Sequence, residues 1–285
     1  MTQKDIPKRP FGNTGPEVTR VGLGGEGVLR TQRREEAAVE VIQEALARGI
    51  AYCDSARVYA DSELYYGSIW GERPEMRDGV FQASKSASRD KDGALKDLEG
   101  SLQRLKTDRL DLWQIHDLRT DADLKAVGGP GGALSAFLEA KESGRVKHIG
   151  VTGHHDPRIL TRAIKEWPVD SVMLPVNPVE GVIGGFLTDT LPAARQKGMA
   201  VIAMKILGAS HYVMDQHGVT AELLIRYALS HDITVAIVGC SSPAEVQTLA
   251  GTGRDSEPLG DREKDRLEAI FKPHARRLAF YRGVI

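Results

Sequence analysis

The sequence predicts an α/β protein in which eight parallel strands alternate with helices and close into a (β/α)8 barrel, the TIM-barrel architecture. Two observations favour this fold. Short β-branched runs alternate with longer amphipathic stretches along the chain, and eight such runs are present. Repeated strand-helix steps form parallel sheets, and eight regular steps suit a closed barrel better than an open sheet.

The eight predicted strands are short apolar runs bounded by turn signals. They comprise the run around Val21 and residues 50–54, 80–85, 110–116, 148–153, 171–176, 200–205 and 234–239. Before them, a turn signal at Asn13-Thr14-Gly15 lies between two extended runs, which predicts a hairpin that caps the barrel floor. Beyond Leu259, a charged segment predicts an extra C-terminal helix and a terminal flap.

Helical patterns separate the strands, and the first covers residues 35–48. Asp156-Pro157 is typical of an N-cap followed by proline at the first helical position. Gly49, Gly144 and Gly198 stand where helix C-caps belong. Residues 118–132 are polar and rich in glycine at their end, which predicts a short loop and an open pocket before a helix from Ala133.

The bulk composition bounds the class of protein. The chain has 285 residues and no Ser/Gly/Pro linker, so we expect residues 1–285 to form a single barrel domain. A net charge of −1 offers no field for nucleic acid or an anionic membrane. The sequence has neither a run of 18 apolar residues nor a signal-like N-terminus, which favours a cytoplasmic location. Cys53 and Cys240 are predicted as core residues.

Four ionisable residues fall at the carboxyl ends of three consecutive predicted strands, where the active sites of such barrels lie. Asp54 ends the second strand, Tyr59 follows it, Lys85 ends the third and His116 ends the fourth. Each alone has a structural explanation as a cap, a core residue or a solvated strand end. Because burying unpaired charge is costly, four such residues at one mouth favour chemistry.

These residue types fit an acid catalyst. A tyrosine is a poor proton donor at neutral pH until a nearby cation favours its anion, and Lys85 can supply that cation to Tyr59. Asp54 would pair with Lys85 and keep it charged, and His116 would hydrogen-bond the substrate oxygen. None of the four supplies electrons, so a nicotinamide cofactor is the natural complement.

These segments resemble the aldo-keto reductase superfamily, whose hallmark is an Asp, Tyr, Lys, His tetrad at these barrel positions. IAYCDSARVYADSELYYG, QASK and LQRLKTDRLDLWQIHD look like its signature segments and carry all four residues. SGRVKHIGVTG is similar to the segment entering the fifth strand, and the likeness extends from PFGNTG to SSPAEV. The resemblance implies an NAD(P)H-dependent oxidoreductase that reduces a small aldehyde or ketone, with Tyr59 as general acid.

The sequence departs from the family pattern where the nicotinamide carboxamide is usually held. Thr152-Gly153, Met173 and Met204 replace the usual Ser-Asn, Gln and aromatic residue. Thr152 can still donate a hydrogen bond, whereas methionine cannot replace an amide. Asn177 or His154 could compensate.

A second departure concerns the adenine end of the cofactor. The backbone and hydroxyls of Ser241 and Ser242 can hold phosphate at a helix N-terminus, but Glu245 stands near the usual arginine and would oppose a 2′-phosphate. Family precedent favours NADPH, with NADH also possible. Gly208-Ala209-Ser210 is the expected pyrophosphate loop. The implied cofactor residues are Gly24, Gly25, Asp54, Thr152, Gly153, Met173, Met204, Lys205, Leu207, Gly208, Gly239, Ser241, Ser242 and Glu245.

Other interpretations remain open. A catalytically slow, cofactor-sensing regulatory subunit with the same fold is the main alternative, because the usual nicotinamide amide is missing. A Rossmann reading of GLGGEG is disfavoured because no helix opens at its third glycine. A metal site is not expected, since the available His and carboxylate residues lie beside Lys85. Glu26, Arg57 and Trp113 are candidate substrate contacts, and the substrate and oligomeric state are left undetermined.

Overall fold

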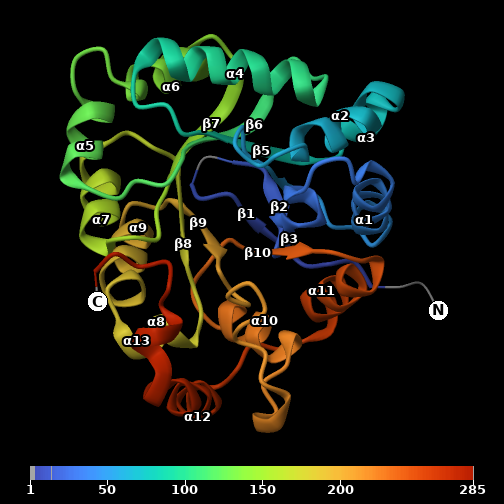
Figure 1. Ribbon diagram of the computed structural model, residues 1–285, viewed down its shortest axis with the longest axis vertical. Helices are drawn as coiled ribbons and strands as arrows, with labels where there is room; N and C mark the ends of the chain where they lie inside the picture. The colour runs from blue at the N-terminus through green and yellow to red at the C-terminus, as the bar shows by residue number, and fades with distance from the viewer. Residues whose placement is uncertain (1–3, 14, 285) are drawn as a thin grey trace.

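In the computed structural model, eight parallel strands form a closed barrel surrounded by helices (Figure 1). The structure describes residues 4–13 and 15–284. The strand order around the barrel is β10-β3-β4-β5-β6-β7-β8-β9, so neighbours in space are neighbours in sequence except where β10 closes on β3. The predicted fold class is therefore confirmed, and all eight strands point their carboxyl ends to one mouth.

Each predicted strand segment overlaps an observed strand, and the ends agree or differ by up to a few residues. The barrel strands are β3 (Val21–Gly27), β4 (Tyr52–Asp54), β5 (Phe81–Ser86), β6 (Leu110–Ile115), β7 (Val146–Thr152), β8 (Ser171–Pro175), β9 (Ala200–Met204) and β10 (Val235–Cys240). Such differences at the ends are expected, because the terminal pairs of a strand depend on its neighbours rather than on its own composition.

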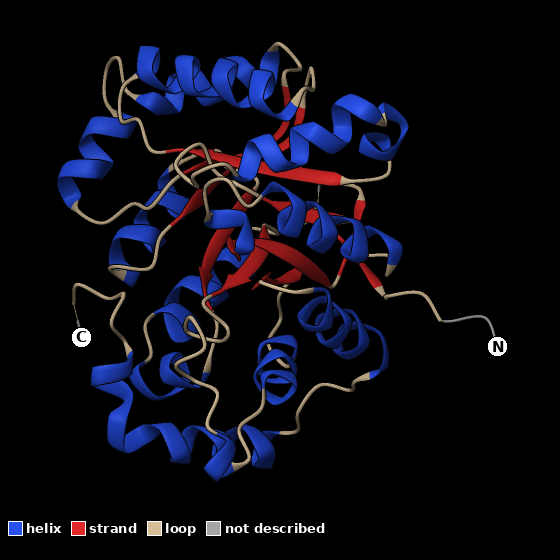
Figure 2. Cartoon of the chain, turned by 45° about the vertical axis from the view of Figure 1, so that its right-hand side comes forward, coloured by secondary structure: helices blue, strands red, loops and turns tan. Residues whose placement is uncertain are grey.

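Helices encircle the strands on the outside of the barrel (Figure 2). They are α1 (Glu35–Ala47), α2 (Ser62–Glu72), α3 (Pro74–Asp78), α4 (Lys91–Leu105), α5 (Asp121–Gly128), α6 (Ala133–Glu142), α7 (Pro157–Glu166), α8 (Pro178–Ile183), α9 (Leu191–Gln196), α10 (Ala221–Leu229), α11 (Pro243–Asp255), α12 (Asp261–Phe271) and α13 (Ala275–Leu278). Short 3-10 turns cover Val28–Arg30, Asp215–His217 and Lys272–His274, and a π-helix covers Phe186–Thr190. Within residues 4–13 and 15–284, no helix combines the length and apolar character needed to cross a membrane.

The predicted helix ends are confirmed. The Asp156 carboxylate accepts a hydrogen bond from the Arg158 amide and caps α7, with Pro157 at its first position. Gly49, Gly144 and Gly198 have φ values of 84, 77 and 66°, the left-handed conformation that glycine adopts without strain.

The segment after His116 was expected to be a short polar loop, and this expectation is wrong. It contains α5, which begins with a capping box between Thr120 and Asp123. The Thr120 hydroxyl accepts from the Asp123 amide at 3.2 Å, and the Asp123 carboxylate accepts from the Thr120 amide at 3.0 Å. A Thr and an Asp three residues apart could have signalled this helix in the sequence.

The predicted hairpin is present as two antiparallel strands, β1 (Lys8–Pro10) and β2 (Glu17–Thr19). Of its predicted turn, Thr14 lies outside the described residues. The Phe11 ring, fully buried, lies 4.7 Å from the ring of Phe81 and 5.3 Å from that of His148, measured between centroids. The hairpin therefore closes the floor of the barrel and leaves the opposite mouth as the accessible end.

The C-terminal segment covers one side of the mouth. Helices α12 and α13 pack against α8, as the red end of the chain shows in Figure 1. After α13, the Arg282 guanidinium pairs with the buried Glu180 carboxylate on α8, and the Tyr281 hydroxyl donates to the same carboxylate. This arrangement matches the extra helix and terminal flap expected from the sequence.

Candidate active site

The structure brings Asp54, Tyr59, Lys85 and His116 together at the barrel mouth. Asp54 is the last residue of β4, Lys85 is the last but one of β5, and His116 follows β6 directly. Tyr59 lies in the turn between β4 and α2. The register pairs Asp54 with Ala83 and Lys85 with Gln114, so consecutive strand ends rise side by side.

Lys85 and Asp54 form a buried ion pair at the base of the group. The Lys85 Nζ atom donates to Asp54 Oδ2 at 2.5 Å and to the Ser55 carbonyl at 2.7 Å. Both residues are 1% exposed. The other carboxylate oxygen, Asp54 Oδ1, is buried and has no hydrogen-bond partner among the described residues. A buried acceptor without a partner is costly, and this oxygen can receive a hydrogen bond from a bound molecule.

Burial opposes charge on both members of this pair. Burial raises the pKa of Asp54 above its usual value, although Lys85 acts in the other direction. Burial likewise lowers the pKa of Lys85, although Asp54 favours its charged form. Burial therefore makes the charged form of both residues costly.

The Tyr59 ring lies between two cations. Lys85 Nζ and Arg30 Cζ each lie 4.8 Å from its centroid. Gly25 permits this position, because a Cβ atom there would lie 2.6 Å from Tyr59 Cδ2. The Tyr59 hydroxyl oxygen lies 3.5 Å from His116 Nε2, at the limit of a hydrogen bond. The phenol is thus aimed at the same point as the imidazole.

The acidity of Tyr59 in the structure differs from the sequence-based expectation. Burial raises its pKa well above the ordinary value, and Asp54 and Glu26 add to this, while Arg30 opposes them. Burial lowers the pKa of His116 to about 3, with Lys85 adding to the effect. The site thus presents a protonated phenol beside a neutral imidazole.

A cavity of about 720 Å³ opens beside Tyr59 and runs across the mouth to α11. Most residues expected at the cofactor line it, drawn from five of the eight strand ends. They are Gly24, Gly25, Asp54, Met173, Met204, Lys205, Leu207, Gly208, Gly239, Ser241 and Glu245. Glycines in this wall allow close approach, since a Cβ at Gly24 would lie 2.9 Å from the Gly239 nitrogen.

Three expected cofactor residues lie outside the cavity wall. The Thr152 hydroxyl accepts a hydrogen bond from the Asp117 amide at 2.8 Å. Gly153 packs near the Leu118 carbonyl. The Ser242 hydroxyl accepts from the Glu245 amide at 3.4 Å and caps α11. Each of the three residues thus contacts neighbouring residues of the barrel mouth rather than the cavity.

Asn177 and His154, considered as substitutes for the missing amide, are held by the framework instead. The Asn177 side-chain amide donates to the Lys205 carbonyl and to the Tyr281 hydroxyl, both at 3.0 Å. His154 Nδ1 lies 3.1 Å from the Tyr281 carbonyl oxygen, and its Nε2 lies 3.4 Å from Asp117 Oδ1. Both side chains therefore tie the C-terminal segment to the mouth.

The loop expected to hold a pyrophosphate has an unusual backbone. Gly208, Ala209 and Ser210 have φ values of 53, 52 and 69°, and Lys205 has 58°. Left-handed conformations of non-glycine residues are strained and cluster at functional sites. All four residues line the cavity, so the loop is shaped toward it.

Glu245 occupies the N-terminus of α11 at the far end of the cavity. Its carboxylate accepts a hydrogen bond from the Ser241 backbone amide at 2.7 Å. Glu245 forms no ion pair among the described residues. The amide that could hold a phosphate is thus covered by a carboxylate.

The three candidate substrate residues have different positions. Glu26 lines the cavity and pairs with Arg30 at 2.6 Å. Trp113 does not reach the cavity, contrary to expectation: it is fully buried and stacks on Phe137 of α6, with centroids 3.6 Å apart. Arg57 also lies outside the cavity wall, over Gly100 on α4.

Arg30 is a charged residue of the cavity wall that sequence reasoning missed. Its guanidinium lies over the Tyr59 ring, and its side chain is 47% exposed. The residue belongs to a short 3-10 turn after β3, and its orientation depends on the fold of that turn. No pattern in the sequence points to it.

The aldo/keto reductase family model matches residues 20–216. L-galactose dehydrogenase of Arabidopsis thaliana is 27% identical, over 94% of this chain and 95% of the relative. The chain spans 62%, 55% and 53% of the length of three further curated relatives.

Solved structures have the same fold. The holo form of aldo-keto reductase AKR11C1 from Bacillus halodurans superposes with a TM-score of 0.76, at 20% identity over 98% of both chains. An aldo-keto reductase from Klebsiella pneumoniae, solved in complex with NADPH, has a TM-score of 0.72 at 23% identity, over 95% of this chain and 96% of its own.

Proposed function

Since the chain belongs to the aldo/keto reductase family, we propose that it reduces a small aldehyde or ketone to an alcohol, with a nicotinamide cofactor as the hydride donor. One observation carries the proposal: the Tyr59 hydroxyl lies 3.5 Å from His116 Nε2 at the end of a large cavity, above a buried Lys85–Asp54 pair. A phenol, an imidazole and a buried cation around one point form a site for carbonyl protonation.

The cavity fits a dinucleotide. Its wall contains Gly24 and Gly239, where a Cβ would collide with neighbouring backbone or side-chain atoms, and the left-handed loop 208–210. Lys205 provides positive charge for phosphate in the same wall. The Klebsiella pneumoniae neighbour with bound NADPH supports NADPH as the cofactor, with NADH as the alternative. When bound, the nicotinamide supplies the hydride.

The residues of this chain then position and protonate the carbonyl. Neutral His116 donates an N–H hydrogen bond to the carbonyl oxygen and fixes its place beside Tyr59. The Tyr59 hydroxyl gives its proton to that oxygen as the alkoxide forms. The Lys85 ammonium, 4.8 Å from the ring centroid, stabilises the tyrosinate left behind, while Asp54 orients Lys85.

A catalytically slow, cofactor-sensing subunit is the second candidate. It is favoured by the composition of the cavity wall, which has no Asn or Gln side chain among the described residues that form it. Met173 and Met204 stand in the wall and offer no hydrogen bond to a carboxamide beyond a weak thioether acceptor. In this candidate the cofactor binds but turnover is slow.

The test begins with calorimetric titration of the purified protein with NADPH and with NADH. Micromolar binding of either, followed by reduction of 4-nitrobenzaldehyde or glyceraldehyde, supports the reductase. Tyr59→Phe, which keeps the ring but removes the hydroxyl, should lower kcat about 100-fold or more without weakening cofactor binding. Tight cofactor binding with no turnover across a broad carbonyl panel would favour the sensing subunit, and no binding at millimolar cofactor would overturn both.

A further inference from the structure

The turn that carries Tyr59 has a strained backbone. Ala60, the next residue, has a φ of 43°. A non-glycine residue in the left-handed region is disfavoured, so an isolated turn would relax to another conformation. Here the Ala60 carbonyl accepts a hydrogen bond at 2.5 Å from Arg104 Nη2, at the end of α4. Arg104 thus holds the turn from outside the barrel.

The same arginine pairs with a buried carboxylate. Arg104 Nε lies 3.2 Å from Glu63 Oε2, within ion-pair distance but without the geometry of a hydrogen bond, and Glu63 is fully buried in the first turn of α2. The Ser84 hydroxyl donates to the other oxygen, Glu63 Oε1, at 2.6 Å. Ser84 directly precedes Lys85 on β5. Glu63 therefore connects the strand of Lys85 to the arginine that holds the Tyr59 turn.

Gly67 allows these elements to approach. A Cβ atom at this position on α2 would lie 1.9 Å from the Arg104 carbonyl oxygen. No other residue could occupy the position without separating α2 from the end of α4. Glu63 and Gly67 belong to the segment that carries Asp54 and Tyr59, and Arg104 belongs to the segment that carries His116. The two segments that hold the reacting groups thus meet here.

We propose that Arg104 and Glu63 are positioning residues that set the placement of Tyr59 relative to Lys85, an inference that rests on the reductase function proposed above. Neither side chain lines the cavity. Their effect passes through Ala60 to Tyr59 and through Ser84 to Lys85. The alternative is that they only join α2 to α4 and stabilise the fold, and the experiment must separate the two.

The test compares Arg104→Met with Arg104→Lys and with the double variant Glu63→Gln/Arg104→Met. The double variant removes both charges and leaves no buried carboxylate unpaired, so it keeps the test open if Arg104→Met does not fold. We expect kcat for 4-nitrobenzaldehyde with NADPH to fall at least tenfold in Arg104→Met and in the double variant. The Kd for NADPH should change less than twofold. Arg104→Lys should be intermediate, because lysine can reach only one of the two partners.

Amide hydrogen exchange supplies a measurement that does not depend on turnover. Exchange in a peptide covering residues 56–62 should rise at least tenfold in Arg104→Met. Arg77→Met is the matched control, since Arg77 also pairs a helix with a strand carboxylate but contacts neither Tyr59 nor Lys85. It should lower Tm at least as much while leaving kcat and exchange at 56–62 unchanged.

Two results would overturn the inference. In one, the Arg104 variants keep kcat within twofold of wild type and exchange at 56–62 does not change. In the other, Arg77→Met loses as much kcat as Arg104→Met for the same loss of Tm. If the wild type reduces no carbonyl compound, the proposed function fails, and exchange at 56–62 still decides whether Arg104 holds the turn.

Discussion

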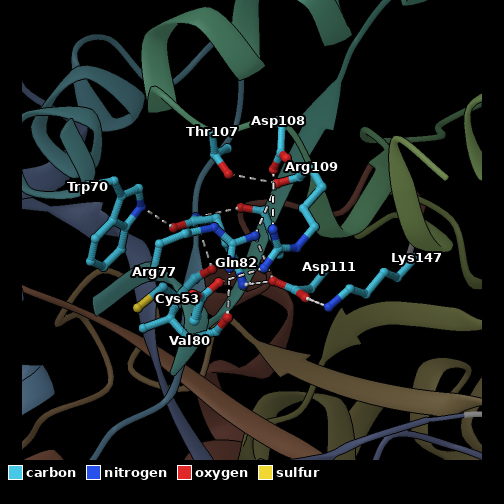
Figure 3. Close-up of polar contacts among 12 residues, drawn as sticks. Cys53, Trp70, Arg77, Val80, Gln82, Thr107, Asp108, Arg109, Asp111 and Lys147 are labelled. Carbon is cyan, nitrogen blue, oxygen red and sulfur yellow. Dashed lines mark hydrogen bonds and ion pairs between the residues drawn. The ribbon is translucent and has the colours of Figure 1, made fainter. Parts of the chain in front are cut away.

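Two buried ion pairs, one at each end of the barrel wall that contains β5, are built differently. Near the amino-terminal ends of β5 and β6, Arg77 pairs with Asp111 at 2.8 Å, and Figure 3 shows the contacts around this pair. At the opposite end of the same wall, Lys85 pairs with Asp54 at 2.5 Å. Both pairs are almost fully removed from water.

The difference lies in how many partners each carboxylate has. Asp111 Oδ2 accepts a hydrogen bond from the Gln82 backbone amide at 2.9 Å and pairs with Arg77. Asp111 Oδ1 accepts from Lys147 Nζ at 2.9 Å (Figure 3). Asp54 Oδ1 has no partner among the described residues. Burial tends to raise the pKa of Asp111, but Arg77, the Gln82 amide and Lys147 together lower it. Burial raises the pKa of Asp54, and neither Lys85 nor a weak contact from the Gly25 backbone amide offsets it.

Both oxygens of the floor carboxylate, Asp111, thus have partners, which suits stability. At the mouth, Asp54 Oδ1 has none among the described residues, which suits chemistry. A charge whose protein partners are saturated gains nothing from a ligand. In the mouth pair, burial disfavours both charges. A negative charge that develops nearby, such as a tyrosinate, therefore interacts strongly with the Lys85 ammonium. The comparison predicts opposite consequences when the cation of each pair is removed.

The largest expected effect is therefore a crossed pair of variants, Lys85→Met and Arg77→Met. Lys85→Met should lower kcat about 1,000-fold, because the buried cation that stabilises the tyrosinate is lost, while the protein stays folded because Asp54 can take up a proton. Arg77→Met should lower the free energy of unfolding by about 3 kcal/mol, because Asp111 keeps its charge after losing a buried partner. Steady-state kinetics and urea unfolding of both variants measure the two effects.

Each variant serves as the control for the other. The contrast between floor and mouth would collapse if Lys85→Met were the more destabilised protein, or if Arg77→Met lost more than a few-fold in kcat at a temperature where it is fully folded.

The sequence predicted these two regions unequally. The four mouth residues could be grouped because strand ends of a parallel barrel meet at one edge and the signature segments identified them. Alternation along β6 could also have excluded Trp113: Leu112 belongs to the interior cluster, so its neighbour points outward to Phe137. Arg30, Arg57 and the partners of Asn177 depend on how turns and the C-terminal segment fold, which no local pattern specifies.

A third carboxylate sharpens the contrast at the mouth, because Glu245 is exposed and, among the described residues, its carboxylate accepts only from the Ser241 amide. We propose that the adenosine ribose of the cofactor lies there. Glu245→Gln should tighten NADPH binding about tenfold, since it removes repulsion of a 2′-phosphate, and change NADH binding much less; tenfold corresponds to about 1.4 kcal/mol. Calorimetry on both cofactors at two salt concentrations measures this. Equal changes for NADPH and NADH would place the 2′ position elsewhere.

The smallest expected effect is on the pH dependence of stability, and it comes from two histidines that stay unprotonated in the folded protein. Burial lowers the pKa of His116 to about 3 and, with Lys264 adding to it, that of His231 to about 4. His231 lies outside the barrel after α10, and its buried Nε2 has no partner among the described residues. Each lowered histidine pKa makes the unfolded chain bind more protons below about pH 6.5, so the free energy of unfolding should fall as pH decreases from about 6.5 to 4.

Asn variants at these two histidines distinguish the barrel mouth from the outside of the barrel by the pH dependence of unfolding and by kcat. His231→Asn should reduce the slope of unfolding free energy against pH between about 6 and 5 by up to about 1.4 kcal/mol per pH unit, with kcat unchanged. His116→Asn should reduce that slope similarly and also lower kcat. Urea unfolding at pH 5, 6 and 7.5 measures the slopes. A slope that His231→Asn leaves unchanged would mean that this histidine is protonated in the folded protein, and the neutral imidazole assigned to His116 by the same argument from burial would need independent proof.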